Sequence, residues 1–430
     1  MRKAALVIVC ALLGTLARLP AAAAQVPGAP TPPGLTLAQL IAAGEQRNPA
    51  IVAARQSVLA ADARIALARS GLGPSVTASG STGTSGTVTG LSSQGYTTSA
   101  TIGASYVVYD SGQTAIAIRQ AEANARGARL TLEATRQDVA LSVATNYVGV
   151  LRAERNVVLR QQLVAQNQEL LRLAEGQFRA GVVPRADVVR AQAGLAAAEG
   201  ELIAGRNLVD VSKAQLNVAV GQPAVTLVAV APPPPVPRLT LAAAQLTGFV
   251  DERPEVKRAM AEIESAELGL SLAQVANGLR VTLNGSASQA ITGSGGTTWA
   301  ITSTVSLPVS DAGRNTAQVA EATANLEAAR ARIETTRLAV QQQSLQALLN
   351  LIDARARIES ARAGLVFAQE SLRLAQGRYA AGAGSFLEVI DAQTALSNAE
   401  QTLARAEYDE VAAVLALRHA LGRSVIEGAI

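Results

Sequence analysis

The sequence predicts a mainly helical protein with a small β part, in which one structural plan occurs twice. Of the 430 residues, 49% are apolar but only 3% are aromatic, which favours long helices packed through small side chains. Similar segments begin at Gly176 and Gly377, a shift of 201 residues. Within each copy the apolar pattern changes from a helical period to a two-residue period and back again.

The N-terminal segment predicts an exported protein. Arg2 and Lys3 precede an apolar stretch and a run of alanines that ends at Ala24. This pattern indicates a secretory signal peptide over residues 1–24. Cys10, the only cysteine, lies inside this segment, so the mature chain contains none. No later stretch is long and apolar enough for a transmembrane helix, and entry into a membrane would therefore require a barrel.

The first copy is expected over residues 25–221. A helical pattern follows Asn48, and alternation with period two begins at Ser75 and predicts a β-hairpin at about 75–108. A long helical hairpin is expected over about 111–221. Its first helix would run without an internal proline to about Phe178, a length of roughly 100 Å. A break near Pro184 would turn the chain back on itself.

The second copy repeats these elements after a proline-rich linker over residues 222–239. It is expected over residues 240–430, with a β-hairpin at about 280–308 and a long helical hairpin at about 312–422. Four strands of about ten residues could cross a bilayer. Two surface hairpins on a soluble protein would give the same weak pattern, so this alternative stays open.

Four strands are too few to close a barrel, because small closed barrels begin at about eight strands. An open sheet edge is not tolerated in bilayer hydrocarbon. If the strands enter lipid, several chains must share one barrel. The long helices would then continue the same ring on the other side of the membrane.

The repeated segments resemble the TolC-like outer-membrane efflux and secretion channels over nearly the whole mature chain. The resemblance rests on "LRLAEGQF" and "LRLAQGRY", on the D-x-G helix starts at Asp110 and Asp311, and on Pro308. It implies a homotrimer that lies in the cell outer membrane and extends into the periplasm. Each chain would contribute four strands to a trimeric twelve-stranded β-barrel and two helical hairpins to a periplasmic α-barrel. It also implies a passive exit duct that an inner-membrane pump recruits through a periplasmic adaptor.

The same resemblance assigns site residues at the ends of the helical hairpins. Glu388 and Asp391 match an acidic ring at the periplasmic entrance, and their i, i+3 spacing independently places both on one helix face. Asp187 and Tyr379 match a pair that holds the two tips together, although Gly384 stands where the family has an arginine. The expected adaptor-docking tips are Gly181, Val182, Val183, Gly382, Ala383 and Gly384.

Several function classes are excluded by residue types. His419 is the only histidine and the mature chain has no cysteine, so we expect no enzyme, no metal site and no cofactor. The net charge is +4, and the arginines are interleaved with Asp and Glu along the predicted helices. No nucleic-acid partner is therefore expected. An exported trimeric coiled-coil stalk or adhesive protein remains the alternative to a duct. The sequence does not separate small-molecule efflux from type I secretion.

Overall fold

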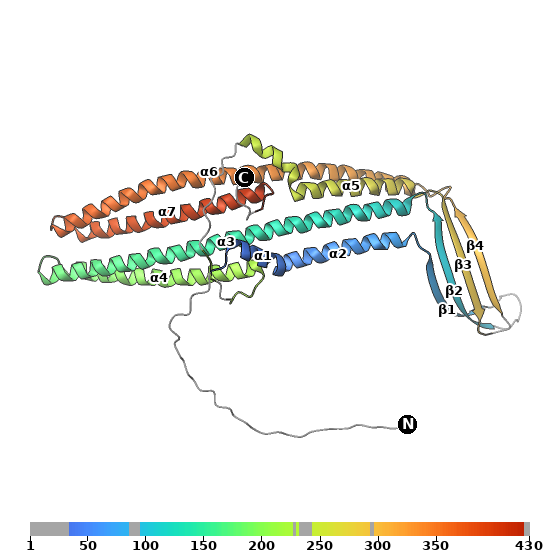
Figure 1. The fold of residues 1–430 in the computed structure, drawn as a ribbon, viewed down its shortest axis with the longest axis horizontal. Coiled ribbons are helices and arrows are strands. Elements are labelled where there is room, and N and C mark those ends of the chain that lie inside the picture. Colours follow the sequence, from blue (N-terminus) through green and yellow to red (C-terminus); the bar gives the residue numbers. More distant parts are fainter. Residues whose placement is uncertain (1–33, 86–94, 227–228, 232–242, 293–295, 425–430) are drawn as a thin grey trace, which may run out of the picture.

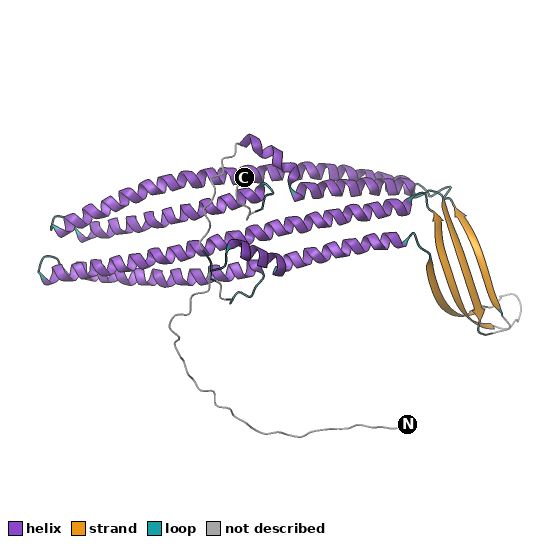
Figure 2. Cartoon of the chain, viewed as in Figure 1, coloured by secondary structure: helices purple, strands orange, loops and turns teal. Residues whose placement is uncertain are grey.

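The protein forms an elongated layer of long helices with a four-stranded sheet at one end (Figures 1 and 2). The computed structural model describes residues 34–85, 95–226, 229–231, 243–292 and 296–424. The predicted signal peptide and most of the predicted linker lie outside these residues.

The helices follow the same order in both halves of the chain. The two longest, α3 and α6, contain 67 residues each. At 1.5 Å per residue, each is a rod of about 100 Å. The helices are α1 (Leu37–Arg47), α2 (Pro49–Ser70), α3 (Gln113–Arg179), α4 (Arg185–Val220), a short 3₁₀ helix (Ala243–Glu252), α5 (Pro254–Val275), α6 (Arg314–Ala380) and α7 (Phe386–Ala420).

The D-x-G segments cap the two long helices. Oδ2 of Asp110 accepts a hydrogen bond from the Thr114 backbone nitrogen at 2.7 Å, and Oδ2 of Asp311 accepts one from the Asn315 nitrogen at 2.8 Å. Two consecutive residues then adopt the left-handed conformation in each copy, and the first of them is Ser111 or Ala312. These caps redirect the chain from strand to helix.

The sheet consists of β1 (Ser75–Ser85), β2 (Gly95–Tyr109), β3 (Arg280–Ala290) and β4 (Thr297–Ser306). All neighbours are antiparallel, in the order β1-β2-β3-β4, so the central pair joins the two copies. The register places Ile102 opposite Ala287, and Ala287 opposite Trp299. Ser105 donates a hydrogen bond to Asn284 at 2.8 Å, on the other face of the sheet. One face is therefore largely apolar and the other largely polar.

The helical layer has a simple order at the end away from the sheet. Helix α3 packs against α4 and α7, and α7 packs against α6. The layer therefore runs α4-α3-α7-α6, with α4 and α6 at its edges (Figure 1). Within the described part of the chain, no helix is both long and apolar enough to cross a membrane.

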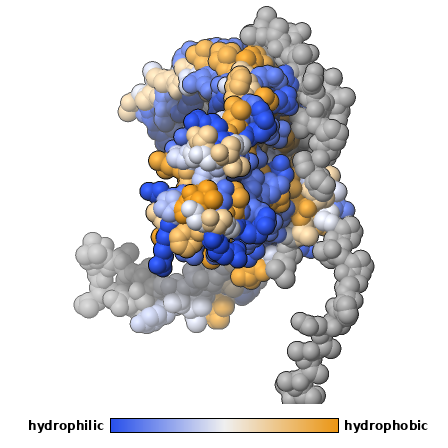
Figure 3. Space-filling view, turned by 90° about the vertical axis from the view of Figure 1, so that its left-hand side faces the viewer, coloured by the Kyte–Doolittle hydropathy of each residue, from blue (hydrophilic) through white to orange (hydrophobic). Residues whose placement is uncertain are grey.

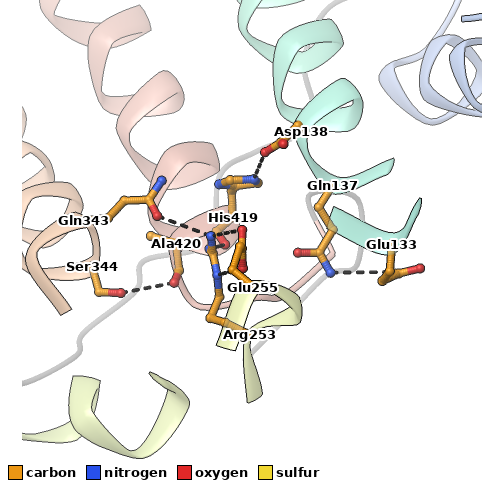
Figure 4. A network of polar contacts seen from close by, with 9 residues as sticks. All are labelled: Glu133, Gln137, Asp138, Arg253, Glu255, Gln343, Ser344, His419 and Ala420. Carbon is orange, nitrogen blue, oxygen red and sulfur yellow. Dashed lines mark hydrogen bonds and ion pairs between the residues drawn. The ribbon is translucent and has the colours of Figure 1, made fainter. Parts of the chain in front are cut away.

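A buried polar network holds the middle of the second copy (Figure 4). Arg253, 1% exposed, donates to Glu255 Oε1 at 2.7 Å, to Gln343 Oε1 at 3.2 Å and to the His419 carbonyl. The His419 ring lies 3.0 Å from Asp138 on α3. The network thus connects the start of α5, the middle of α6 and the end of α7 to the first copy.

Candidate functional site

The two helical hairpins end side by side in tight turns that contain the predicted docking residues. Gly181 and Gly382 adopt positive φ angles of 75° and 71°, which favour glycine. In both turns the next residue donates a backbone hydrogen bond into the end of the preceding helix: Val182 to Gln177 at 3.0 Å, and Ala383 to Arg378 at 2.9 Å. The two turns therefore share one geometry, as the repeat predicts.

Apolar side chains are exposed at the tips. Val182 is 64% exposed and Leu387 is 55% exposed, and Phe178 and Val189 are also exposed. Figure 3 views the molecule from this end and shows such side chains among hydrophilic ones. Exposed apolar residues at the end of a rod suit a protein contact.

The predicted acidic pair lies on the first two turns of α7. Glu388 and Asp391 are both exposed, one helical turn apart. The Ser385 hydroxyl caps α7 by accepting a hydrogen bond from the Glu388 backbone nitrogen at 3.2 Å. The carboxylate of Glu388 lies 3.3 Å from Nη1 of Arg378 on α6.

The predicted latch residues are both buried at the tips. Asp187 is 6% exposed and lies 3.3 Å from Arg190 on its own helix. Tyr379 is 4% exposed, and its hydroxyl makes no hydrogen bond with the described residues. Its ring centroid lies 5.4 Å from that of Phe386. Asp187 and Tyr379 therefore form no hydrogen bond with each other in this structure.

The electrostatics nevertheless relate Tyr379 to Asp187. Burial raises the pKa of the Tyr379 phenol, and the Asp187 carboxylate raises it further. The hydroxyl therefore keeps its proton and can act as a donor to a carboxylate. The Asp187 carboxylate therefore interacts electrostatically with the phenol but forms no hydrogen bond with it.

One apolar cluster joins the two hairpins near the tips. It contains Leu170 and Ala191 of the first copy together with Tyr379, Phe386 and Val389 of the second. A hydrogen bond between the side chains of Gln393 on α7 and Gln166 on α3 lies beside it. The tips of one chain are therefore held together mainly by apolar packing.

Gly384 has a steric role in the second turn. A Cβ atom at this position would lie 2.9 Å from Cβ of Arg378 and 3.2 Å from the Tyr379 nitrogen. A side chain here would therefore require a local shift of the Arg378 stem or of the turn; the first turn holds such a side chain, because Val183 occupies the matching position. An arginine at position 384, where the resemblance places one, would need the same shift.

A groove of about 600 Å³ lies directly behind the tips. Residues from three helices line it, among them Asn167 of α3, Gly194 of α4 and Thr394 of α7. It follows the side of the layer where α4 and α7 flank α3. Among the described residues, no group of three His, Cys, Asp or Glu side chains could hold a metal ion.

Three residues at the tips were missed by reasoning from the sequence: Arg190, Phe386 and Arg378. The i, i+3 spacing of Asp187 and Arg190 was a signal for the first ion pair. The other two residues contact groups across a turn, and sequence spacing carries no comparable signal for such contacts.

Comparison with known proteins identifies the same architecture. The family model described as outer membrane efflux protein matches residues 40–222 and 249–423. Nodulation protein T of Rhizobium leguminosarum bv. trifolii is 24% identical over 396 residues, covering 88% of this chain and 84% of the relative.

Solved structures share the fold at low sequence identity. CusC superposes with a TM-score of 0.80 at 19% identity, over 90% of this chain and 92% of that one. VceC of Vibrio cholerae superposes with a TM-score of 0.78 at 22% identity, over 90% of this chain and 96% of VceC. MtrE of Neisseria gonorrhoeae, solved in an open state, superposes with a TM-score of 0.77 at 20% identity, over 90% of this chain and 89% of MtrE. The family and these neighbours are channel proteins and not enzymes, which confirms the prediction that this chain is not an enzyme.

Proposed function

The chain belongs to the outer membrane efflux protein family, and on this premise we propose that it is a passive exit duct of a tripartite efflux or type I secretion system. Substrates would pass from an inner-membrane pump across the periplasm and the outer membrane. The observation that carries the proposal is an open layer of helices and strands, which a single chain leaves with free edges on both sides.

The internal repeat indicates what covers the free helix edges. Inside the chain, α3 packs against α7, and His419 lies 3.0 Å from Asp138. By the 201-residue shift, the equivalents are Val218 on α4 (419 − 201) and Ala339 on α6 (138 + 201), both exposed. A second copy of the chain would bring these two edges together and repeat the internal contact. Exposed Leu338 and Phe367 on α6, at 65% and 74%, support this pairing.

The sheet leads to the same assembly. Strands β1 and β4 each have one edge without a partner strand in the described sheet. Trp299 and Ile301, 76% and 70% exposed, follow the alternation that puts apolar side chains on one face. Three copies would supply twelve strands and close a barrel with this face toward lipid. The homotrimer is therefore the assembly we propose.

The tips are the proposed periplasmic entrance. Exposed Val182 and Leu387, with the groove behind them, fit docking of a periplasmic adaptor that carries apolar side chains. Glu388 and Asp391 would form the acidic ring around the threefold axis. Asp187 and Tyr379 would form a latch if a small shift brought the buried hydroxyl to the carboxylate.

Conductance in planar lipid bilayers tests the duct. The purified outer-membrane protein should insert as a trimer and give discrete conductance steps. Heat-resistant trimers that never conduct would contradict the duct and favour the exported stalk.

Docking is tested separately in living cells by a photoreactive residue in place of Val183. It should capture a periplasmic adaptor of a pump system, whereas the same residue in place of exposed Leu67 on α2, far from the tips, should not. An equal capture at both positions would contradict docking at the tips.

A further inference from the structure

The second tip contains an ion pair that crosses its turn, and the first tip does not. Arg378 lies in the last turn of α6, and its Nη1 is 3.3 Å from Oε2 of Glu388 in the first turn of α7. Both side chains are more than two-fifths exposed, at 61% and 44%. The pair therefore contributes little to stability, but it fixes where a positive charge lies.

The turn itself positions the guanidinium group. Gly384 has no Cβ, and its backbone packs against the stem of Arg378 at a distance that a Cβ would reduce to 2.9 Å. Nη2 of Arg378 also donates to the Ala383 carbonyl at 3.5 Å. On the other side, Ser385 caps the helix start that carries Glu388. These contacts hold the cation beside one particular carboxylate.

The corresponding positions of the first tip lack this cation. The 201-residue shift places Gln177 at the position of Arg378 and Val183 at that of Gly384. The equivalent of Glu388 is Asp187, which is buried and pairs with Arg190 on its own helix. An exposed carboxylate neutralised from across the turn is therefore specific to the second copy.

Asp391 differs from Glu388 in its surroundings. It is exposed and makes no ion pair with any residue that the structure describes. We infer that Arg378 is the counter-cation of the proposed entrance ring: it neutralises Glu388 and leaves Asp391 as the carboxylate that attracts permeating cations. This inference rests on the proposed duct and on its threefold symmetry.

The consequence is a ring with half the negative charge that its carboxylates suggest. Each chain contributes two carboxylates and one guanidinium group, a net charge of −1 instead of −2. Charge at a narrow entrance sets the local concentration of small ions within about a Debye length, roughly 10 Å at 0.1 M salt. Arg378 would therefore limit cation selectivity as directly as Asp391 creates it.

The test is the potassium-to-chloride permeability ratio of the purified full-length trimer, from reversal potentials in a salt gradient. Arg378→Gln should raise this ratio by about twofold or more, because it doubles the ring charge. Glu388→Gln leaves Arg378 unopposed and should bring the ratio close to unity. The double variant should return to the wild-type ratio, and Arg378→Lys should keep it.

The matched control is Arg373→Gln. Arg373 lies on the same helix and pairs with Glu370 at 2.6 Å, away from the turn. This substitution removes the same charge from α6 and should leave the ratio nearly unchanged. A purely structural role of Arg378 would change the thermal stability of the trimer without moving the reversal potential.

The possible results separate this inference from the proposed duct. A wild-type trimer without conductance overturns both. A conducting trimer in which Glu388→Gln and Asp391→Asn both lower the ratio, while Arg378→Gln leaves it unchanged, overturns the counter-cation alone. A Glu388→Gln channel that keeps about half of the wild-type selectivity also overturns the counter-cation alone, because it shows that no positive charge was left unopposed.

Discussion

The two hairpin tips have the same backbone and opposite polar chemistry. In the first, Asp187 is 6% exposed and pairs with Arg190. In the second, the matching positions hold Glu388 and Asp391, both exposed. Over residues 169–190 the first tip carries four basic and three acidic side chains, whereas residues 370–391 carry two basic and three acidic ones. A duplicated scaffold thus presents a slightly basic tip beside an acidic one.

In the middle of the molecule, by contrast, the two copies use different residues for the same purpose, which is to connect the start of one helix to the end of another. Asn48 precedes α2 and donates to the Ala219 carbonyl at 2.8 Å, near the end of α4. Arg253 precedes α5 and donates to the His419 carbonyl, near the end of α7. Both close their own copy. The comparison indicates that the contacts which close each copy differ in residue type but keep their place in the fold, whereas the side chains at the tips have diverged.

The largest expected effect is on the two closing contacts. Arg253→Ala leaves partly buried Glu255 and the His419 carbonyl without their donor and should destabilise the protein by about 3 kcal/mol or more. Asn48→Ala removes a helix cap and one hydrogen bond, for about 1–2 kcal/mol. Denaturant unfolding followed by circular dichroism measures both.

Arg258→Ala is the control for these closing contacts. Arg258 is half-exposed and pairs with Glu262 at 3.3 Å, so its loss should change stability by less than about 0.5 kcal/mol. Equal losses for Arg253→Ala and Asn48→Ala would show that the buried network stabilises the second copy no more than the Asn48 contacts stabilise the first.

The next effect concerns the tips. Tyr379→Phe removes the buried hydroxyl and should shift the closed-to-open ratio of the channel about tenfold toward open, because a hydrogen bond to a carboxylate contributes about 1.5 kcal/mol. Single-channel recording measures the open probability. Phe178, at the matching position of the first tip, is 43% exposed, and Phe178→Tyr should change nothing. An unaltered open probability for Tyr379→Phe would rule out the latch.

A smaller effect is expected at acidic pH from the cap of α6. The side-chain hydrogen bond from Asn277 and the backbone hydrogen bond from Asn315 lower the pKa of Asp311. The folded state therefore binds this proton less readily than the unfolded chain, whose aspartate pKa is about 3.9. The stabilisation is present above that value and is lost as the pH falls through the lower folded pKa.

Replacement of the carboxylate checks this assignment. Asp311→Asn should flatten the acid limb of the stability curve, measured from thermal unfolding midpoints below about pH 5. An unchanged acid limb would show that Asp311 contributes no proton linkage.

The smallest expected effect is a difference in stability between glycine variants of the two left-handed residues, Ser111 and Ala312, that precede the long helices. Ala312 has a φ angle of 55°, and Ala312→Gly should stabilise the protein by about 0.5–1 kcal/mol. Ser111 has a φ angle of 56°, but its hydroxyl donates to the Leu279 carbonyl at 2.9 Å, so Ser111→Gly should give no gain. Thermal unfolding midpoints of both variants test this difference. A higher stability for both variants would show that the hydrogen bond from Ser111 does not stabilise the protein.

Local patterns explain what the sequence could predict. The long helices follow from stretches without proline and from the D-x-G caps, and the strands follow from alternation that the observed register keeps. Sequence spacing does not indicate that the Gly384 backbone packs closely on the stem of Arg378. That contact, the burial of Tyr379 and the pairing of His419 with Asp138 all depend on how distant segments meet, which one sequence does not show.

The central claim is that the free edges of one chain pack against those of the next as α3 packs against α7 inside the chain. The only cysteine, Cys10, lies in the predicted signal peptide, so a variant with Val218→Cys and Ala339→Cys can be cross-linked in cells by a short bis-maleimide. We expect covalent dimers and trimers for the double variant, and no ladder for either single variant. A double variant that stays monomeric on a denaturing gel, while the protein conducts, would contradict the claim.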